Sequence, residues 1–327
     1  MLENRSVTRL AAAVIAGLLW LPQCASAQGY PTRQVRMIVP FPAGGGSDGL
    51  ARLLAERMSG TLGQRVVIEN IAGAGGTIGS TSAAKAAPDG YTVMMGNVGT
   101  HSVAPLLDRK LAYLPERDFM PIAHFAYLTN YVVAGPSLKA ASLAELIRMA
   151  NLSPGKITFA SAGLATPAHL ALELFRIRTG VNVLHVPYKG AAPAITDLLG
   201  GHVDVIIGDP VTLLPHIAAG KVRALAFAGP RRSAALPDVP TAAEAGVADF
   251  HVRAWHGILA PAGVSPEVAR KLVEAIQAAT RDSATVATLA RMGAEPGDEV
   301  LDRFAQLIQA ERARWGEVIT RANIKIE

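Results

Sequence analysis

Short apolar runs, each followed by a glycine-rich turn and a segment of helical periodicity, repeat three times in the first third of the chain. The first run, 35–40, precedes apolar positions at helical spacing that end at Gly63. The second and third runs are 66–68 and 92–96, with a helix of small residues expected near 78–86 between them. Strand, glycine-rich turn and helix in this order predict an α/β sheet with parallel strands.

The same alternation returns in the middle of the chain. Two helix starts stand out: the capping box Ser142–Glu145, and Thr166 followed by Pro167, an N-cap with proline at the first helical position. Two further helices are expected at 191–199 and 211–219. The expected strands of this second series are 121–127, 131–134, 157–160, 183–186, 203–207 and 222–228.

A stretch rich in proline and glycine, 229–246, interrupts the second series. One more strand, 255–260, is followed by helices that begin at Ser265 and near Leu301. The first series has few helices of its own, so we expect these terminal helices to cover its sheet. The aromatic residues of this region are expected in the core: Trp255, Phe304 and Trp315.

The first 27 residues have the pattern of a secretory signal. Arg5 and Arg9 precede the apolar run 10–21, and Ala25-Ser26-Ala27 forms a cleavage site. An apolar run this short does not span a membrane. We expect cleavage after Ala27 and a periplasmic protein. The chain has one cysteine, Cys24, which leaves with this segment, so a mature disulfide is not expected. Lipidation of Cys24 is an alternative, although Gln23 stands where a lipobox has a small residue.

Two series joined by returning helices predict two domains over 327 residues. We expect residues 28–124 and 253–327 to form domain 1 and residues 125–252 to form domain 2.

Composition narrows the classes of function. Half the residues are apolar and 17% are charged, which excludes a disordered chain. The 31 Lys and Arg against 26 Asp and Glu are spread evenly, which favours small anions over nucleic acid as partners. The eight histidines lack metal-binding spacing, and the glycine-rich turns match neither a P-loop nor a dinucleotide fingerprint, so no metal or cofactor is expected.

The glycine-rich turns are the candidate ligand site. Ligands of open α/β sheets bind at the carboxyl ends of strands, and helix N-termini there offer free N–H groups to a carboxylate or phosphate. His169 lies in the first turn of the Thr166 helix, where it could help to close an anion site. Tyr188 and Asp209 also follow strands, with turn packing or helix capping as the alternative roles.

One pattern indicates an enzyme instead. Gly45-Gly46-Ser47-Asp48-Gly49 matches the nucleophile elbow of hydrolases between a strand and a helix. Such an enzyme needs a histidine and an acid, for which His256, Asp204 and Asp209 are candidates. The alternative is that Ser47 or Asp48 only caps the helix.

Several colinear motifs over residues 30–327 resemble the Bug family, the extracytoplasmic solute receptors of tripartite tricarboxylate transporters. The matching segments are 38–48, 69–79, 87–92, 161–169, 185–190, 236–246 and 259–263. The resemblance implies an α/β, two-domain periplasmic-binding-protein fold (Venus-flytrap, type II-like) with a mostly parallel, helix-flanked sheet in each domain. It implies a carboxylate-containing ligand, delivery to a membrane permease, a monomer, no catalysis and no cofactor. A receptor for a membrane sensor kinase is an alternative that the sequence does not separate from transport.

The resemblance and the turns together place the ligand between the domains. The expected ligand-binding residues are Phe41, Pro42, Ala43, Gly44, Gly45, Ser47, Asp48, Asn97, Thr100, Ser161, Ala162, Gly163, Thr166, His169, Tyr188 and Asp209. Two positions depart from the family pattern, the Gly46-Ser47 pair and the carboxylate of Asp209. An extra acid beside the cleft is expected to disfavour a polyanion such as citrate and to favour a monocarboxylate or a ligand with an amine or hydroxyl.

Overall fold

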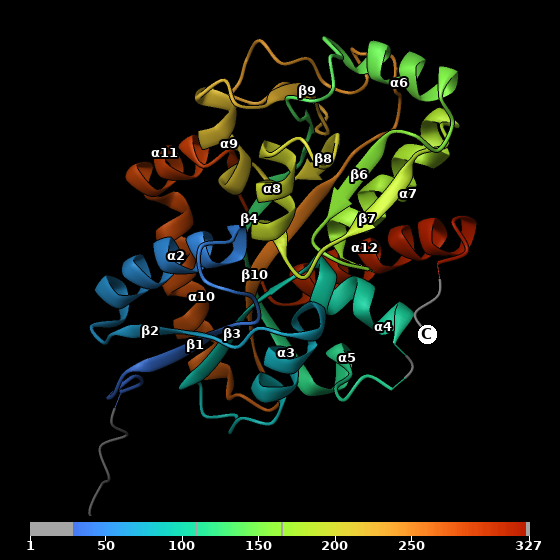
Figure 1. Cartoon of the computed structure of the whole chain (residues 1–327). Coiled ribbons are helices and arrows are strands. Elements are labelled where there is room, and N and C mark those ends of the chain that lie inside the picture. Colours follow the sequence, from blue (N-terminus) through green and yellow to red (C-terminus); the bar gives the residue numbers. More distant parts are fainter. Residues whose placement is uncertain (1–28, 109, 165, 325–327) are drawn as a thin grey trace, which may run out of the picture.

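The computed structural model describes residues 29–108, 110–164 and 166–324. The expected signal segment and Cys24 lie outside these residues. The chain forms two lobes, each built on one sheet (Figure 1). Lobe 1, residues 29–129 and 253–324, has a six-stranded sheet in the order β11-β4-β10-β3-β1-β2. Lobe 2, residues 130–252, has a five-stranded sheet in the order β7-β6-β8-β5-β9.

Lobe 1 is assembled from both ends of the chain. Its strands are β1 (Val35–Val39), β2 (Val66–Asn70), β3 (Thr92–Asn97), β4 (Phe119–Thr129), β10 (Arg253–Pro261) and β11 (Ala294–Pro296). Its helices are α2 (Gly46–Leu62), α3 (Thr77–Ala84), α4 (Ala104–Leu107), α5 (Pro115–Asp118), α10 (Pro266–Arg281), α11 (Ser283–Arg291) and α12 (Asp302–Arg321), with the single turns η1 (Ala74–Gly76) and η2 (Gly99–Val103).

Lobe 2 is one continuous segment. Its strands are β5 (Tyr131–Ala134), β6 (Thr158–Ser161), β7 (Leu184–Pro187), β8 (Val205–Gly208) and β9 (Arg223–Phe227). Its helices are α6 (Leu143–Leu152), α7 (Pro167–Thr179), α8 (Ala191–Leu199) and α9 (Pro210–Ala218).

Both sheets are mixed, and the expected parallel pairing holds for half of each. β2-β1-β3 and β7-β6-β8 run parallel, as strand–helix–strand units require. β4, β5 and β10 carry the chain between the lobes, and they pair with their neighbours in antiparallel fashion, because the chain passes straight from β4 into β5 and β10 returns beside β4. The parallel halves place the carboxyl ends of β1, β2 and β3 together on lobe 1, and those of β6, β7 and β8 together on lobe 2.

The chain crosses between the lobes at Asn130 and at Val252. The Asn130 N–H donates to the Val252 carbonyl (3.0 Å), the Val252 N–H donates to the Ala228 carbonyl (2.8 Å), and the Ala228 N–H donates to the Asn130 carbonyl (2.9 Å). Three short backbone bonds therefore tie both crossings together. The sequence-based division at 124/125 lies within β4, and the division into domains remains a prediction.

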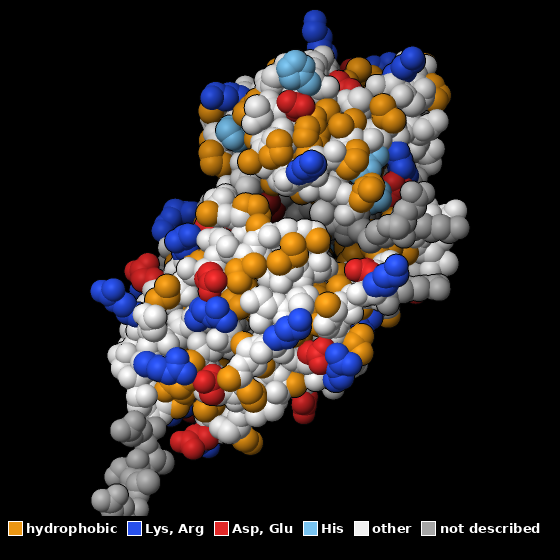
Figure 2. All heavy atoms as spheres, turned by 60° about the horizontal axis from the view of Figure 1, so that its bottom comes forward, with side chains coloured by type: hydrophobic (Ala, Val, Ile, Leu, Met, Phe, Trp, Pro, Cys, Tyr) orange, Lys and Arg blue, Asp and Glu red, His pale blue; other side chains and the backbone are white. Residues whose placement is uncertain are grey.

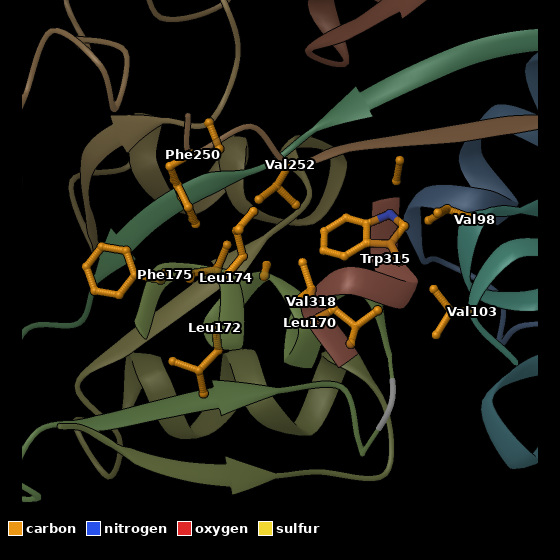
Figure 3. Close-up of a cluster of buried hydrophobic side chains, with 14 of the residues drawn as sticks. Val98, Val103, Leu170, Leu172, Leu174, Phe175, Phe250, Val252, Trp315 and Val318 are labelled. Atoms are coloured by element: carbon orange, nitrogen blue, oxygen red, sulfur yellow. The ribbon is translucent and has the colours of Figure 1, made fainter. Parts of the chain in front are cut away.

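Helices cover both faces of the lobe 1 sheet, as expected for the terminal helices. α10 packs beside α2 on one face, and α12 packs on η2 and β4 of the other. Phe304 and Trp315 of α12 are buried, and so is Trp255 of β10, which confirms their place in the core. Figure 3 shows that Trp315 and Val318 lie beside Leu170 of α7, so one apolar cluster joins the two lobes. Among the described residues, every helix is too short or too polar to cross a membrane.

Candidate functional site

The N-terminus of α2 is buried without a side-chain cap. α2 begins at Gly46, directly after the loop that leaves β1, and its N-cap Gly45 has no side chain to offer. The first N–H groups of a helix have no partner within the helix, and they carry about half a positive charge in sum. Gly46, Ser47 and Asp48 are nevertheless buried. A buried helix end with open donors is suited to hold an anion.

Ser47 is tied to the ends of two strands of the same sheet. Its Oγ lies 3.0 Å from Nε2 of His256 on β10 and 3.5 Å from Nδ2 of Asn97 on β3. Nδ1 of His256 faces the carbonyl oxygen of Ala254 at 3.2 Å, so Nδ1 carries the proton and Nε2 accepts from the Ser47 hydroxyl. Burial lowers the pKa of His256 to about 4, which keeps the ring neutral. The Ser47 side chain thus anchors the helix end.

Asp48 braces the loop that precedes α2. Its carboxylate accepts from the Gly44 N–H, from Arg52 Nε and from Asn70 Nδ2, each at 2.9 Å. Burial raises the pKa of Asp48, but these hydrogen bonds and the Arg52 charge outweigh it, and the pKa is lowered overall. Asn70 also donates to the Phe41 carbonyl (3.0 Å). Asp48 therefore shapes the loop, and its carboxylate is fully used in doing so.

Three loops of lobe 1 meet at this edge. A Cβ on Gly76, whose φ is +97°, would lie 2.7 Å from Thr100 and 3.1 Å from the Phe41 ring, so the loops after β1, β2 and β3 touch. Asn97 and Thr100 exchange backbone-to-side-chain hydrogen bonds, with the Thr100 N–H donating to Asn97 Oδ1 at 3.1 Å. Pro42, Ala43 and Gly44 are exposed at the rim of this loop cluster.

Lobe 2 presents a tight turn after β6. Ser161 Oγ lies 3.0 Å from the Gly163 carbonyl oxygen, 3.2 Å from the Gly163 nitrogen and 2.7 Å from Nε2 of His185 on β7. Gly163 has φ +140°, a conformation that a side chain would strain. Thr166 then caps α7 by accepting from the His169 N–H. Half-exposed Ala162 accepts from the Gly190 N–H at 3.0 Å, which joins this turn to the loop after β7.

His169 and Tyr188 each contact other side chains of lobe 2. The His169 ring stacks on that of His185, and its Nε2 lies 3.6 Å from the Glu173 carboxylate. The Tyr188 hydroxyl donates to Asp197 of α8 at 2.6 Å, and burial, followed by that carboxylate, raises its pKa to about 12. This hydrogen bond ties the loop after β7 to α8, and the ligand-binding roles of Tyr188 and His169 stay predictions.

The two lobes face each other across these elements. A Cβ on Gly46 would lie 2.9 Å from Oδ1 of Asp209, and one on Gly99 would lie 3.3 Å from Pro167, at the start of α7. Asp209 also caps α9 by accepting from the Thr212 N–H (3.1 Å), and burial raises its pKa. Figure 2 shows a narrow hollow between the lobes, with histidine side chains beside it. The expected site residues of both lobes thus lie at or just behind one interface.

Two side chains of this region escaped the sequence-based list. Asn70 and His185 each lie inside a motif quoted for the family, but their roles depend on contacts that the sequence alone does not show. His256, considered only as a catalytic partner, proves to anchor Ser47. Among the described residues, no group of three His, Cys, Asp or Glu side chains could hold a metal ion.

Comparisons with known proteins agree with this architecture. The model of the tripartite tricarboxylate transporter family receptor matches residues 50–324. Protein BugT of Bordetella pertussis is 39% identical over 307 residues, which cover 92% of this chain and 93% of BugT. The structure of R. palustris Rpa4515 with adipate is 37% identical with a TM-score of 0.87, covering 90% of this chain and 99% of that one. MatC from Rhodopseudomonas palustris with bound malate is 36% identical with a TM-score of 0.79, covering 89% and 100%. The chain belongs to the receptor family of tripartite tricarboxylate transporters.

Proposed function

We propose that this protein captures a small organic acid between its two lobes and presents it to the membrane permease of a tripartite tricarboxylate-type transporter. Two relatives, described above, were solved with adipate and with malate, both of which carry two carboxylates. The ligand residues are those of the loops at the cleft, including Ser47, Asn97, Thr100, Ser161 and Thr166. A ligand that touches both lobes favours the closed arrangement, which is how occupancy reaches a partner.

The observation that carries this proposal is the buried, uncapped N-terminus of α2 opposite Asp209. A carboxylate that takes about four charge-assisted hydrogen bonds gains roughly 1.5–3 kcal/mol from each. The helix end adds about 1–2 kcal/mol, and association costs at least about 4 kcal/mol. The remainder, about 3–10 kcal/mol, spans weak to micromolar or tighter binding without an arginine clamp.

The hydrolase interpretation of Ser47 is not supported. The family consists of solute receptors. A triad needs a carboxylate on the second nitrogen of the histidine, and His256 has the Ala254 carbonyl oxygen there instead. The candidate acids are used elsewhere: Asp204 accepts from Thr158, and Asp209 caps α9. A neutral histidine with a lowered pKa is also a weak base for the Ser47 hydroxyl.

Asp209 bears on the kind of acid that binds. Its carboxyl group lies against the same helix end that would hold the ligand carboxylate, so a further negative charge is disfavoured there. A raised pKa lets Asp209 carry a proton more readily than an exposed acid, and a protonated carboxyl donates a hydrogen bond. We therefore propose that the cleft prefers acids of low charge, or acids with a hydroxyl or amine near Asp209, over citrate.

Titration calorimetry with malate, adipate and citrate tests the proposal. We expect saturable binding of one molecule of malate or adipate per chain and weaker binding of citrate. None of the three acids should be chemically converted. The variant Asp209→Asn, which keeps a capping side chain, should narrow the difference between malate and citrate. The absence of saturable binding by all three acids would refute the proposal.

Export is part of the same proposal. Residues 1–27 have the pattern of a cleavable signal, and a receptor of this family acts outside the cytoplasm. Expression of the full chain in a bacterium, followed by fractionation and sequencing of the mature N-terminus, should give a periplasmic monomer that begins at Gln28. Retention of the full-length chain in the cytoplasm would contradict this part.

A further inference from the structure

The Ser161 hydroxyl has three polar neighbours, and two of them fix the direction of their hydrogen bond with it. The Gly163 carbonyl oxygen (3.0 Å) can only accept, and the Gly163 N–H (3.2 Å) can only donate. The third neighbour is Nε2 of His185 at 2.7 Å, which donates or accepts according to its tautomer. A hydroxyl has one proton and two lone pairs. All three contacts are satisfied together only if Nε2 of His185 carries a hydrogen.

We propose that His185 is a positioning residue of the ligand site, which donates through Nε2–H to Ser161 and takes up a further proton when a carboxylate binds to the turn. This inference rests on the proposed function, because the carboxylate is the ligand proposed above. The hydrogen bond matters because Ser161 holds Gly163 at φ +140° and thereby sets the backbone donors between β6 and α7. Protonation leaves Nε2–H in place, so the turn keeps its shape in both charge states.

The surroundings of His185 decide where its proton stands. Its ring stacks on that of His169 with the centroids 4.3 Å apart and the planes at 6°. The other charged groups that act on it, Glu173 and Arg176, come from α7 as well, and Arg176 is paired with Glu173. Burial, and then His169, lower the pKa of His185 to about 4. In the free protein His185 is therefore neutral near pH 6.

Ligand binding changes this balance in one direction. A carboxylate held at the turn adds a negative charge near His185, which favours the charged ring. The bound state then holds more protons than the free state, so binding strengthens as the pH falls through the bound-state pKa and levels off below about 4. Half-buried His185 can exchange this proton with solvent.

The tautomer is measurable without any ligand. Long-range ¹H–¹⁵N spectra of the mature protein, residues 28–327, at pH 7 should show His185 with the hydrogen on Nε2. Finding the hydrogen on Nδ1 would overturn the positioning role, whatever the ligand proves to be.

Variants separate the hydrogen bond from the charge. His185→Gln keeps an amide donor near the position of Nε2 but does not titrate, whereas His185→Leu loses both. At pH 7.5 we expect His185→Gln to bind malate or adipate within about twofold of the wild type, and His185→Leu to bind about tenfold more weakly, the loss of one hydrogen bond. His202→Gln, an exposed histidine of lobe 2, is the matched control and should behave as the wild type.

Proton uptake decides the second half of the inference. At pH 5.5, the dependence of the binding enthalpy on the buffer should show uptake of a sizeable fraction of one proton by the wild type and by His202→Gln. His185→Gln should show clearly less. Equal uptake in His185→Gln and the wild type would overturn the assignment of the proton to His185. Failure of malate, adipate and citrate to bind the wild type would instead refute the proposed function, while the tautomer measurement still decides the positioning role.

Discussion

The substitution Gly46→Ala tests whether α2 of lobe 1 lies as close to Asp209 of lobe 2 as the structure shows. Gly46 is the first residue of α2 and has no positive φ, so alanine fits its backbone without strain. Its Cβ would nevertheless lie 2.9 Å from Oδ1 of Asp209 in lobe 2 and 2.9 Å from Cδ1 of Leu128 in lobe 1. Contacts this short are absent from packed proteins, so the neighbours must move apart.

The magnitude follows from the cost of overpacking. An inserted methyl in a tightly packed place costs about 1–3 kcal/mol. Asp209 is held by its capping bonds to Thr212, so part of the strain falls on the contact between the lobes. If ligand binding requires the lobes to meet at this contact, as proposed above, affinity for malate or adipate should drop by about 5- to 150-fold. The free energy of unfolding of the chain should change less than the free energy of binding.

Calorimetry and urea unfolding of Gly46→Ala measure the two quantities, and small-angle scattering reports whether the lobes close. Gly49→Ala is the matched control, because its Cβ would meet only Met292 at 3.2 Å and Val211 at 3.4 Å, contacts that a small shift relieves. Combining Gly46→Ala with Asp209→Ser, which keeps a capping hydroxyl on a shorter side chain, should restore part of the affinity. An affinity within twofold of the wild type in Gly46→Ala would refute the reasoning.

Three further outcomes are expected. Ser47→Ala should lower the free energy of unfolding by about 1–3 kcal/mol, because Nε2 of buried His256 loses its hydrogen-bond partner. Neither the wild type nor this variant should hydrolyse esters. Ester hydrolysis by the wild type but not by the variant would contradict this. Thr166→Ala and Asp282→Ala each remove a helix N-cap and should cost about 1 kcal/mol in urea unfolding, but only the former should weaken malate binding. A hydrogen bond from buried His124 lowers the pKa of Glu299 to about 2, so this bond stabilises the fold above pH 4.5 and its contribution is lost as the pH falls from 4.5 toward 2. Because Glu299 is partly exposed, solvent screening limits this contribution to about 1 kcal/mol. The melting temperature of Glu299→Gln should fall less steeply with pH over this range than that of the wild type, and equal slopes would refute this.

Local signals in the sequence located most of the architecture. Ser142, Thr166 and Ser265 each cap a helix where a capping residue precedes an apolar pattern, and each accepts from the N–H three residues later. The alternation of apolar runs located the strands around both loop clusters. Such signals depend on neighbours in the chain, so they can be read from one sequence.

Features that depend on long-range packing could not be predicted in this way. Ser47 and His256 are 209 residues apart, and only the pairing of β3 with β10 brings them together. The three-residue strand β11 has too few positions to show a period. The contacts of Tyr188 with Asp197 and of His169 with His185 likewise depend on side chains of other elements.

The paired crossings at Asn130 and Val252 determine what kind of movement the molecule can make. Two adjacent segments joined by backbone hydrogen bonds bend together but cannot slide past one another, so we expect any movement of one lobe on the other to be a rotation about these crossings. Under the proposed function, substitutions in the glycine-bearing loops would then alter the choice of solute while the shape offered to the permease stays the same.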